Sequence, residues 1–292
     1  MKNKLLLIWV FAFSALPLFA QIEVKRSMQH DSFLLYESIP VRVEIRNVSG
    51  GTLQFGGEEP NAYLRFVVRN TRNQVIHRTD VPLYDTMWVI PDGIRSARNF
   101  DLVQLYQIRN AESYRCEITL IADGEQWKLD PLLFAVKNGT SHGTVRRRST
   151  DRSFSLISVN RKSGDELMLR LSDYREQTTL ATYTLERVML FIPPEMRVDH
   201  NGRVHILFYQ SNRQMVYCRF HGDGRPIIRQ YLRPTTQRPR LVEHEEFGFW
   251  VPGAEVLEPL DPVPAGDAAP PAAAGATAEP VAGVISDALE LQ

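Results

Sequence analysis

The sequence predicts an all-β fold, in which a β-sandwich is followed by a second antiparallel β-meander domain. Short runs of apolar and β-branched residues recur along residues 21–253, and turn residues separate them at spacings of about 8–12 residues. Within several runs apolar and polar residues alternate, which is typical of strands that bury one face. After Pro252 the composition shifts to alanine and proline, which indicates that the folded part ends there.

Residues 1–20 are predicted to be a secretory signal peptide. Lys2 and Lys4 are followed by an uncharged run from Leu5 to Ala20. A positive start, a short apolar stretch and a small residue at its end are the marks of such a peptide. A membrane anchor is the alternative, although a spanning helix needs about 20 apolar residues. We expect cleavage near Ala20 and export to the periplasm or the cell exterior, with membrane contact only through this segment.

Residues 21–138 are predicted to form the sandwich. Val41–Arg46 alternates apolar and charged residues, as a half-buried strand does. Tyr63–Arg69 and Gln74–Arg78 are expected to be strands on either side of the polar turn Asn70–Asn73.

The same domain is expected to end in a hairpin and one further strand. Glu112–Ala122 and Glu125–Lys128 are joined by Asp123 and Gly124, a pair that suits a tight turn because both residues tolerate positive φ. Leu132–Lys137 supplies the last strand. About seven short strands of this kind favour a β-sandwich.

Tyr114 stands at the start of a strand, two residues before Cys116. In immunoglobulin-like sandwiches a tyrosine at this position binds backbone just upstream. Together with the strand patterns at 41–50, 53–55 and 64–68, these residues resemble bacterial extracytoplasmic immunoglobulin-like domains of the proteinase-inhibitor and macroglobulin types. The resemblance covers about residues 22–138. It implies an immunoglobulin-like fold, and it suggests inhibition of an extracytoplasmic peptidase as one function to test.

Residues 139–152 are predicted to be a linker, because Asn138–Gly143 is rich in turn residues and three arginines follow at 146–148. The second β-domain is expected over residues 153–253, with strands near 154–159, 166–171, 179–185, 204–209, 214–220, 227–232 and 247–250. The stretch 199–207 resembles a hairpin of a β-propeller blade. A propeller needs about four or more blades, so two blade-like sheets or a small meander packed on the first domain remain the alternatives.

Residues 254–292 are predicted to be a flexible tail, because they offer few large apolar side chains to offset the entropy of ordering. Val284–Leu291 could form a short helical turn. No Lys or Arg follows Arg240, and residues 1–240 carry 34 basic and 24 acidic side chains. Arginines spread singly along exposed strands explain this excess, and a polyanionic glycan or a membrane surface is the alternative. Nucleic acid is not expected as a partner of an exported chain.

The two cysteines, Cys116 and Cys218, lie within apolar strand faces of different predicted domains. An oxidising compartment would allow a disulfide between them. Their placement favours two buried, unpaired thiols that act as small hydrophobic side chains.

The sequence contains no signature of a phosphate-binding loop, a zinc protease, a hydrolase elbow or a redox pair. We therefore expect no catalytic residue, no bound metal and no cofactor. One group could hold zinc if its strands brought it together, although histidines near turns are ordinary; it consists of Asp199, His200, His205 and His221.

Two further groups have a functional and a plain structural interpretation. Paired carboxylates can catalyse the hydrolysis of glycosides. The first group contains three carboxylates and one histidine, and a solvated loop explains it equally well; it consists of Glu243, His244, Glu245 and Glu246. Aromatic side chains can stack on sugar rings or fill a small core; this group consists of Tyr209, Tyr217, Phe247, Phe249 and Trp250.

The expected function is therefore non-enzymatic binding or scaffolding in the cell envelope. The expected partner is a protein of the envelope or of the cell exterior, or else a glycan. Inhibition of an extracytoplasmic peptidase is the first alternative, and binding or hydrolysis of a glycan is the second.

Overall fold

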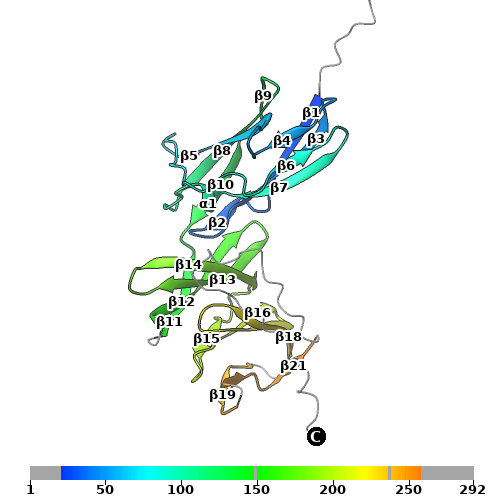
Figure 1. Ribbon diagram of the computed structural model, residues 1–292. Coiled ribbons are helices and arrows are strands. Elements are labelled where there is room, and N and C mark those ends of the chain that lie inside the picture. Colours follow the sequence, from blue (N-terminus) through cyan, green and yellow to red (C-terminus); the bar gives the residue numbers. More distant parts are fainter. Residues whose placement is uncertain (1–20, 148–149, 236–237, 247, 258–292) are drawn as a thin grey trace, which may run out of the picture.

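The computed structural model describes residues 21–147, 150–235, 238–246 and 248–257, and within them the chain is almost entirely β (Figure 1). Its one described helix, α1 (Leu102–Leu105), has four residues. No helix in the described ranges is long and apolar enough to cross a membrane. The predicted signal peptide and residues 258–292 of the predicted tail lie outside the described residues.

Residues 21–137 form two sheets that face each other, and we call this unit the first sandwich. The smaller sheet has the antiparallel order β1-β3-β7, with strands β1 (Gln21–Met28), β3 (Pro40–Val48) and β7 (Arg95–Asp101). The larger sheet has the order β2-β10-β8-β5-β4-β6, with β9 beside β8; its strands are β2 (Ser32–Leu34), β4 (Leu53–Phe55), β5 (Ala62–Asn70), β6 (Trp88–Ile90), β8 (Ser113–Ala122), β9 (Glu125–Lys128) and β10 (Leu132–Lys137).

A single hydrophobic core joins the two sheets of the first sandwich. Val43 on β3, Phe66 on β5 and Ile118 on β8 all belong to it. The alternation predicted for residues 41–46 is confirmed, because β3 buries every second residue. Burial of such a face removes apolar surface from water and is the main force that holds the two sheets together.

Local signals in the first sandwich were informative. Asp123 and Gly124 have φ values of 49° and 79°, and they join β8 to β9 as the hairpin prediction requires. The Tyr114 hydroxyl donates a hydrogen bond of 2.9 Å to the carbonyl oxygen of Asn110, which confirms the predicted tie to upstream backbone. The strand expected at Gln74–Arg78 is wrong, since only two isolated bridges form there and Gln74 and Val75 are exposed.

Residues 140–256 contain a second pair of facing sheets, which we call the second sandwich. One sheet is the four-stranded meander β11 (Thr140–Arg147), β12 (Arg152–Arg161), β13 (Gly164–Asp173) and β14 (Thr178–Arg187). The other has the order β15-β16-β17-β18-β21, with strands β15 (Glu195–Val198), β16 (Val204–Ser211), β17 (Gln214–Phe220), β18 (Pro226–Pro234) and β21 (Ala254–Val256).

The two sheets of the second sandwich share a core that includes Phe154, Leu169 and Phe208. On the opposite face of the five-stranded sheet, a smaller core includes Leu207 and Tyr217, and the hairpin β19 (Val242–His244) and β20 (Gly248–Trp250) packs Phe249 against it. This region therefore consists of two facing antiparallel sheets, in which β11–β14 and β15–β18 are neighbours in chain order.

The predicted linker 139–152 is wrong over residues 140–147, because this segment is strand β11 and pairs with β12 along its length. β11 is an exposed edge strand with a register shift between Ser141 and Gly143. Because an exposed edge buries few side chains, its residue types resemble those of a loop. The predicted tail is likewise wrong at its start, because residues 254–256 form β21. Only Asn138 and Gly139 therefore lie between β10 and β11.

Both cysteines are free and buried, as predicted. Cys116 lies in the core of the first sandwich and Cys218 in that of the second. Burial raises the pKa of the Cys116 thiol to about 12 and that of Cys218 to about 11, so neither is a reactive thiolate at neutral pH.

Candidate functional site: the groove at the junction of the two sandwiches

The two sandwiches meet where β2 lies against the four-stranded sheet. Leu34, at the end of β2, is fully buried in a cluster with Ile157, Val159 and Met168. These three side chains point away from the core of the second sandwich, because alternate residues of a strand face opposite sides of its sheet. The outer face of the four-stranded sheet is thus the docking face for the first sandwich.

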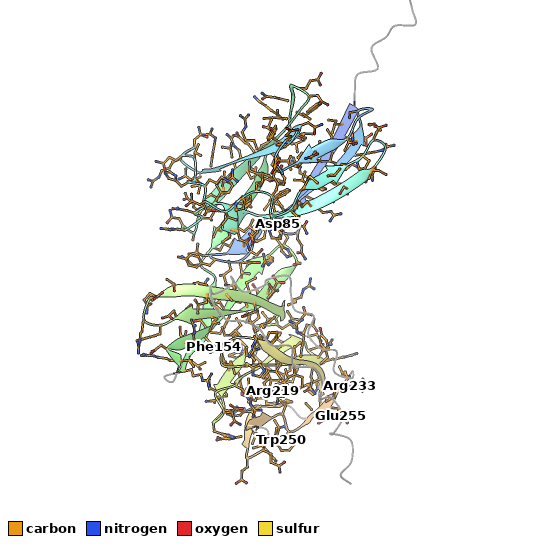
Figure 2. All side chains as sticks on the ribbon, in the orientation of Figure 1. Asp85, Phe154, Arg219, Arg233, Trp250 and Glu255 are labelled. Atoms are coloured by element: carbon orange, nitrogen blue, oxygen red, sulfur yellow. The ribbon has the colours of Figure 1, made fainter. Side chains whose placement is uncertain are left out.

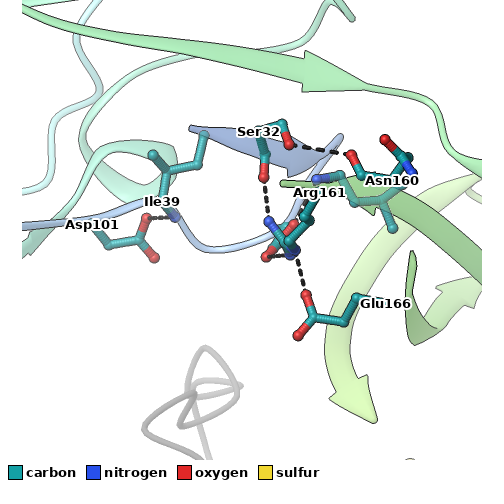
Figure 3. Close-up of polar contacts among 8 residues, drawn as sticks. Ser32, Ile39, Asp101, Asn160, Arg161 and Glu166 are labelled. Carbon is teal, nitrogen blue, oxygen red and sulfur yellow. Dashed lines mark hydrogen bonds and ion pairs between the residues drawn. The ribbon is translucent and has the colours of Figure 1, made fainter. Parts of the chain in front are cut away.

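Arg161 links the two sandwiches from the last position of β12. Its side chain is 2% exposed, and its Nη2 donates a hydrogen bond of 2.5 Å to Glu37 Oε1. The guanidinium also donates to the backbone carbonyl of Ser32 and forms an ion pair with Glu166 (Figure 3). One cation therefore binds a carboxylate and a backbone carbonyl of the first sandwich and a carboxylate of the second.

Glu37 is held from two directions. Its Oε2 accepts a hydrogen bond of 2.5 Å from the Leu34 backbone N–H, while its Oε1 binds Arg161. Burial raises the pKa of Glu37 to about 7, although the Arg161 charge and the Leu34 N–H act in the opposite direction. The second carboxylate at the same guanidinium, Glu166, adds to the rise.

A second arginine and one glycine complete the contact. Arg170 Nη2 donates a hydrogen bond of 2.6 Å to the Leu35 carbonyl oxygen, and its guanidinium lies 5.7 Å from the centre of the Tyr36 ring. Gly139 has a φ of +72°, and a Cβ at this position would lie 2.7 Å from the Ser158 carbonyl oxygen. Only glycine lets the chain cross between the sandwiches at this distance.

A groove opens beside this contact. One hollow of about 370 Å³ is lined by residues 28–31, 132–133 and 161–163, and an adjacent one of about 240 Å³ by residues 31–32, 135, 137 and 160–162. We call the two together the junction groove. Leu133 lines its wall, and 68% of its surface is exposed to solvent.

The charges of the junction groove are mostly positive. Lys162 Nζ lies 2.6 Å from Asp31 Oδ2, and this contact lowers the pKa of the Asp31 carboxyl. Lys137 Nζ donates a hydrogen bond of 3.0 Å to the Asn160 carbonyl oxygen. Burial and the Arg161 charge lower the pKa of His30, so this imidazole is neutral at pH 7. Asp31 is the one carboxylate among the residues that line the groove.

The histidine group considered for zinc does not assemble. His205 is fully buried, with Nε2 3.0 Å from Asp199 Oδ2 and Nδ1 2.7 Å from the Tyr217 hydroxyl. His200 instead lies against the Asn201 amide. Within the described ranges no three His, Cys, Asp or Glu side chains are grouped so that they could hold a metal.

The Asp199–His205 pair is a closed polar centre. Arg203 donates to Asp199 through both its backbone N–H and its Nε, at 2.8 and 2.6 Å. Burial lowers the pKa of His205. Gly248 covers Asp199 so closely that a Cβ would lie 2.3 Å from Oδ2. Without access for a substrate, the centre ties the five-stranded sheet to the β19–β20 hairpin.

The other two predicted groups do not form a site either. The acidic residues Glu243, Glu245 and Glu246 are exposed around the β19–β20 hairpin, as a solvated loop would be. Tyr209 and Tyr217 are core residues, and Phe247 lies outside the described residues. Trp250 is 48% exposed and lies at the end of the molecule remote from the junction (Figure 2).

Sequence reasoning missed the junction residues altogether. Arg161 and Glu37 look like solvated charges in a list of residues, and they meet across 124 positions of the chain. One signal was present: alternation along β12 places Arg161 on the same face as Ile157 and Val159. A cation in line with two buried apolar residues indicates a buried ion pair.

Comparisons with known proteins leave the family open. No family model matches the chain, and no curated protein matches it. Among solved structures, the sporulation control protein Spo0M from Bacillus subtilis is 10% identical with a TM-score of 0.27, covering 68% of this chain and 78% of its own.

A second solved structure is the CsuC–CsuE complex of a chaperone and a tip adhesion subunit, from archaic chaperone-usher Csu pili of Acinetobacter baumannii. It is 10% identical with a TM-score of 0.25, covering 56% of this chain and 87% of its own. TM-scores this low assign no family to the chain.

Proposed function

We propose that this chain is an exported, non-enzymatic binding protein of the cell envelope that holds a segment of a partner protein in the junction groove. The observation that carries the proposal is the groove itself, which lies between two sandwiches fixed to each other by the buried Arg161 contacts. A pre-formed groove binds without the entropic cost of ordering its own walls.

The lining of the groove suits a peptide better than a small polar molecule. Met28, Leu132 and Leu133 supply apolar surface, while Lys137 and Lys162 supply positive charge at the rim. Apolar anchors surrounded by charged residues are the usual anatomy of a protein–protein contact. The partner segment should therefore be apolar with acidic flanks.

The immunoglobulin-like character that we infer for the first sandwich is compatible with the same proposal. Its two facing sheets and the bond of Tyr114 to Asn110 are what the resemblance implied. Such sandwiches are used for many purposes, so the fold by itself does not choose a function. Peptidase inhibition and glycan binding stay predictions, and the identity of the captured partner decides between inhibition and scaffolding.

The test places a photo-activated cross-linking residue at Leu133 and, as a matched control, at Val89. Both side chains are exposed, but Val89 lies on β6, at the opposite edge of the same sheet from β2. We expect one envelope protein to be captured from position 133 and not from position 89. With the purified partner, Leu133→Glu should weaken binding about tenfold or more, since loss of a central anchor costs about 2 kcal/mol, and Val89→Glu should leave it unchanged. Equal capture from both positions would rule out the groove as the binding site.

A further inference from the structure

We propose that in the free protein the junction groove is occupied by this chain's own C-terminal segment 284–291, which a partner has to displace. The inference rests on the proposed function, because it assigns a competitor to the same groove.

Charge complementarity points to this occupant. Residues 258–292 contain six acidic residues and no lysine or arginine. The groove has the opposite balance, since Lys137 and Lys162 line it together with the single carboxylate Asp31, while the Arg161 charge is paired with Glu37 and Glu166. Asp31 is already paired with Lys162, and Lys162 keeps 85% of its side chain exposed, so its charge can attract a second carboxylate.

The apolar content of the segment points to the same place. Most of residues 258–292 are alanine, proline and glycine, but the segment 284–291 brings together Val284, Ile285, Leu289 and Leu291. Asp287 and Glu290 lie between them. The groove offers the matching surface, because Met28, Leu132 and the exposed Leu133 lie beside the two lysines. Covering Leu133 would remove apolar surface from water, at about 25 cal/mol per Å².

The connecting chain is long enough. β21 belongs to the sheet remote from the junction, and the four-stranded sheet lies between it and the first sandwich (Figure 1). Packed sheets are spaced about 10 Å apart, so across these layers the segment has to span at least about 20 Å. The 26 residues 258–283 have a root-mean-square length of about 30 Å as a flexible chain. A tether matched to its span gives an effective concentration in the millimolar range, so a weak contact suffices for occupancy.

The test uses the full chain with a photo-activated cross-linking residue in place of Leu289. We expect intramolecular cross-links to residues 28–32, 132–137 or 160–163. Lys162→Glu should reduce their yield about tenfold, which corresponds to about 1.4 kcal/mol. Lys25→Glu is the matched control, because Lys25 is an exposed lysine on β1, outside the groove, and it should change nothing. Cross-links scattered over the surface, or insensitive to Lys162→Glu, would overturn the proposal.

Failure of this inference is distinguishable from failure of the proposed function. If Leu289 does not reach the groove but Leu133 still captures a partner, only the self-occupancy is wrong. If Leu289 reaches the groove and Leu133 captures no other protein, the groove serves an intramolecular contact alone. The double variant Asp287→Lys, Glu290→Lys should raise the affinity for the partner if both proposals hold, and an unchanged affinity contradicts the competition.

Discussion

At the junction, the burial of the Arg161 charge has to be offset by several contacts at once. Removing an ion from water costs several kcal/mol even after the protein relaxes, and this cost is offset only when every polar atom finds a partner. Here a guanidinium that is 2% exposed satisfies Glu37, Glu166 and the Ser32 carbonyl oxygen at once. The same arrangement makes each of these groups dependent on the others.

The close contacts around Gly139 predict the effect of adding a single Cβ atom there. Gly139→Ala should lower the free energy of unfolding by about 2–5 kcal/mol, because the added Cβ meets the Ser158 carbonyl oxygen and an alanine at positive φ is strained. The control is Gly93→Ala, where φ is +77° but no atom lies within 4 Å; it should cost about 1 kcal/mol. Urea denaturation measures the free energy of unfolding of both variants. Equal losses would show that the junction relaxes around the added Cβ.

At the level of elements, β2 and the turn that follows it behave as one docking element. Residues 32–37 are bound by Arg161 and Arg170, and Leu34 is inserted into the cluster on the four-stranded sheet. Glu37 belongs to this element, and its raised pKa makes the contact dependent on pH. A carboxyl whose pKa is higher in the folded state favours folding below its unfolded pKa of about 4.5, and this contribution is lost as the pH rises through about 7.

Glu37→Gln tests this dependence, because glutamine keeps the shape and remains uncharged at every pH. We expect the variant to be relatively more stable than the parent at pH 8, and the difference in Tm to shrink as the pH falls to 5.5. Thermal unfolding at both pH values measures it. Glu44→Gln, on the partly exposed outer face of β3, serves as the control, and a difference that stays constant between pH 8 and 5.5 would refute the assignment to Glu37.

The elements that the sequence predicted well are those with strong local signals. β10 matches its predicted range, and the Asp123-Gly124 hairpin and the Tyr114 bond formed as expected. β11 was missed because an exposed edge strand buries little, so that glycine and arginine within it resemble a loop. Its strand character comes from pairing with β12, a tertiary effect that local propensity does not contain.

The candidate site could not be predicted from local sequence patterns for the same reason. Arg161 meets Ser32 and Glu37 across 129 and 124 positions, and no periodic pattern encodes which distant charges become partners. Asp199 and His205 belong to the group that was considered for zinc, and they do meet, but as a buried pair without access. Strand order therefore predicted one structural contact and not the groove.

At the level of the whole molecule, the chain passes from one sandwich to the other once, at Asn138 and Gly139. The two units are therefore held together by side-chain contacts rather than by shared strands. Unfolding of both in a single step depends on those contacts.

Arg161→Met should separate the two units. Removing one partner of a buried ion pair costs about 3–5 kcal/mol, so we expect calorimetry to show two transitions in place of the single one of the parent. Lys162→Met is the neighbouring control: this lysine is 85% exposed, and a surface pair contributes at most about 1 kcal/mol. A single transition with unchanged Tm in Arg161→Met would mean that the apolar cluster around Leu34 alone couples the units.

The separation of Arg161 from Glu37 along the chain also means that the two residues are synthesised at different times. A ribosome adds about 5–20 residues per second, so Glu37 waits about 6–25 s before residue 161 exists, given the 124 positions between them. A carboxylate that stays hydrated until then avoids the cost of being buried without a partner. The burial of the Glu37 charge is thus postponed until the arginine that compensates it has been made.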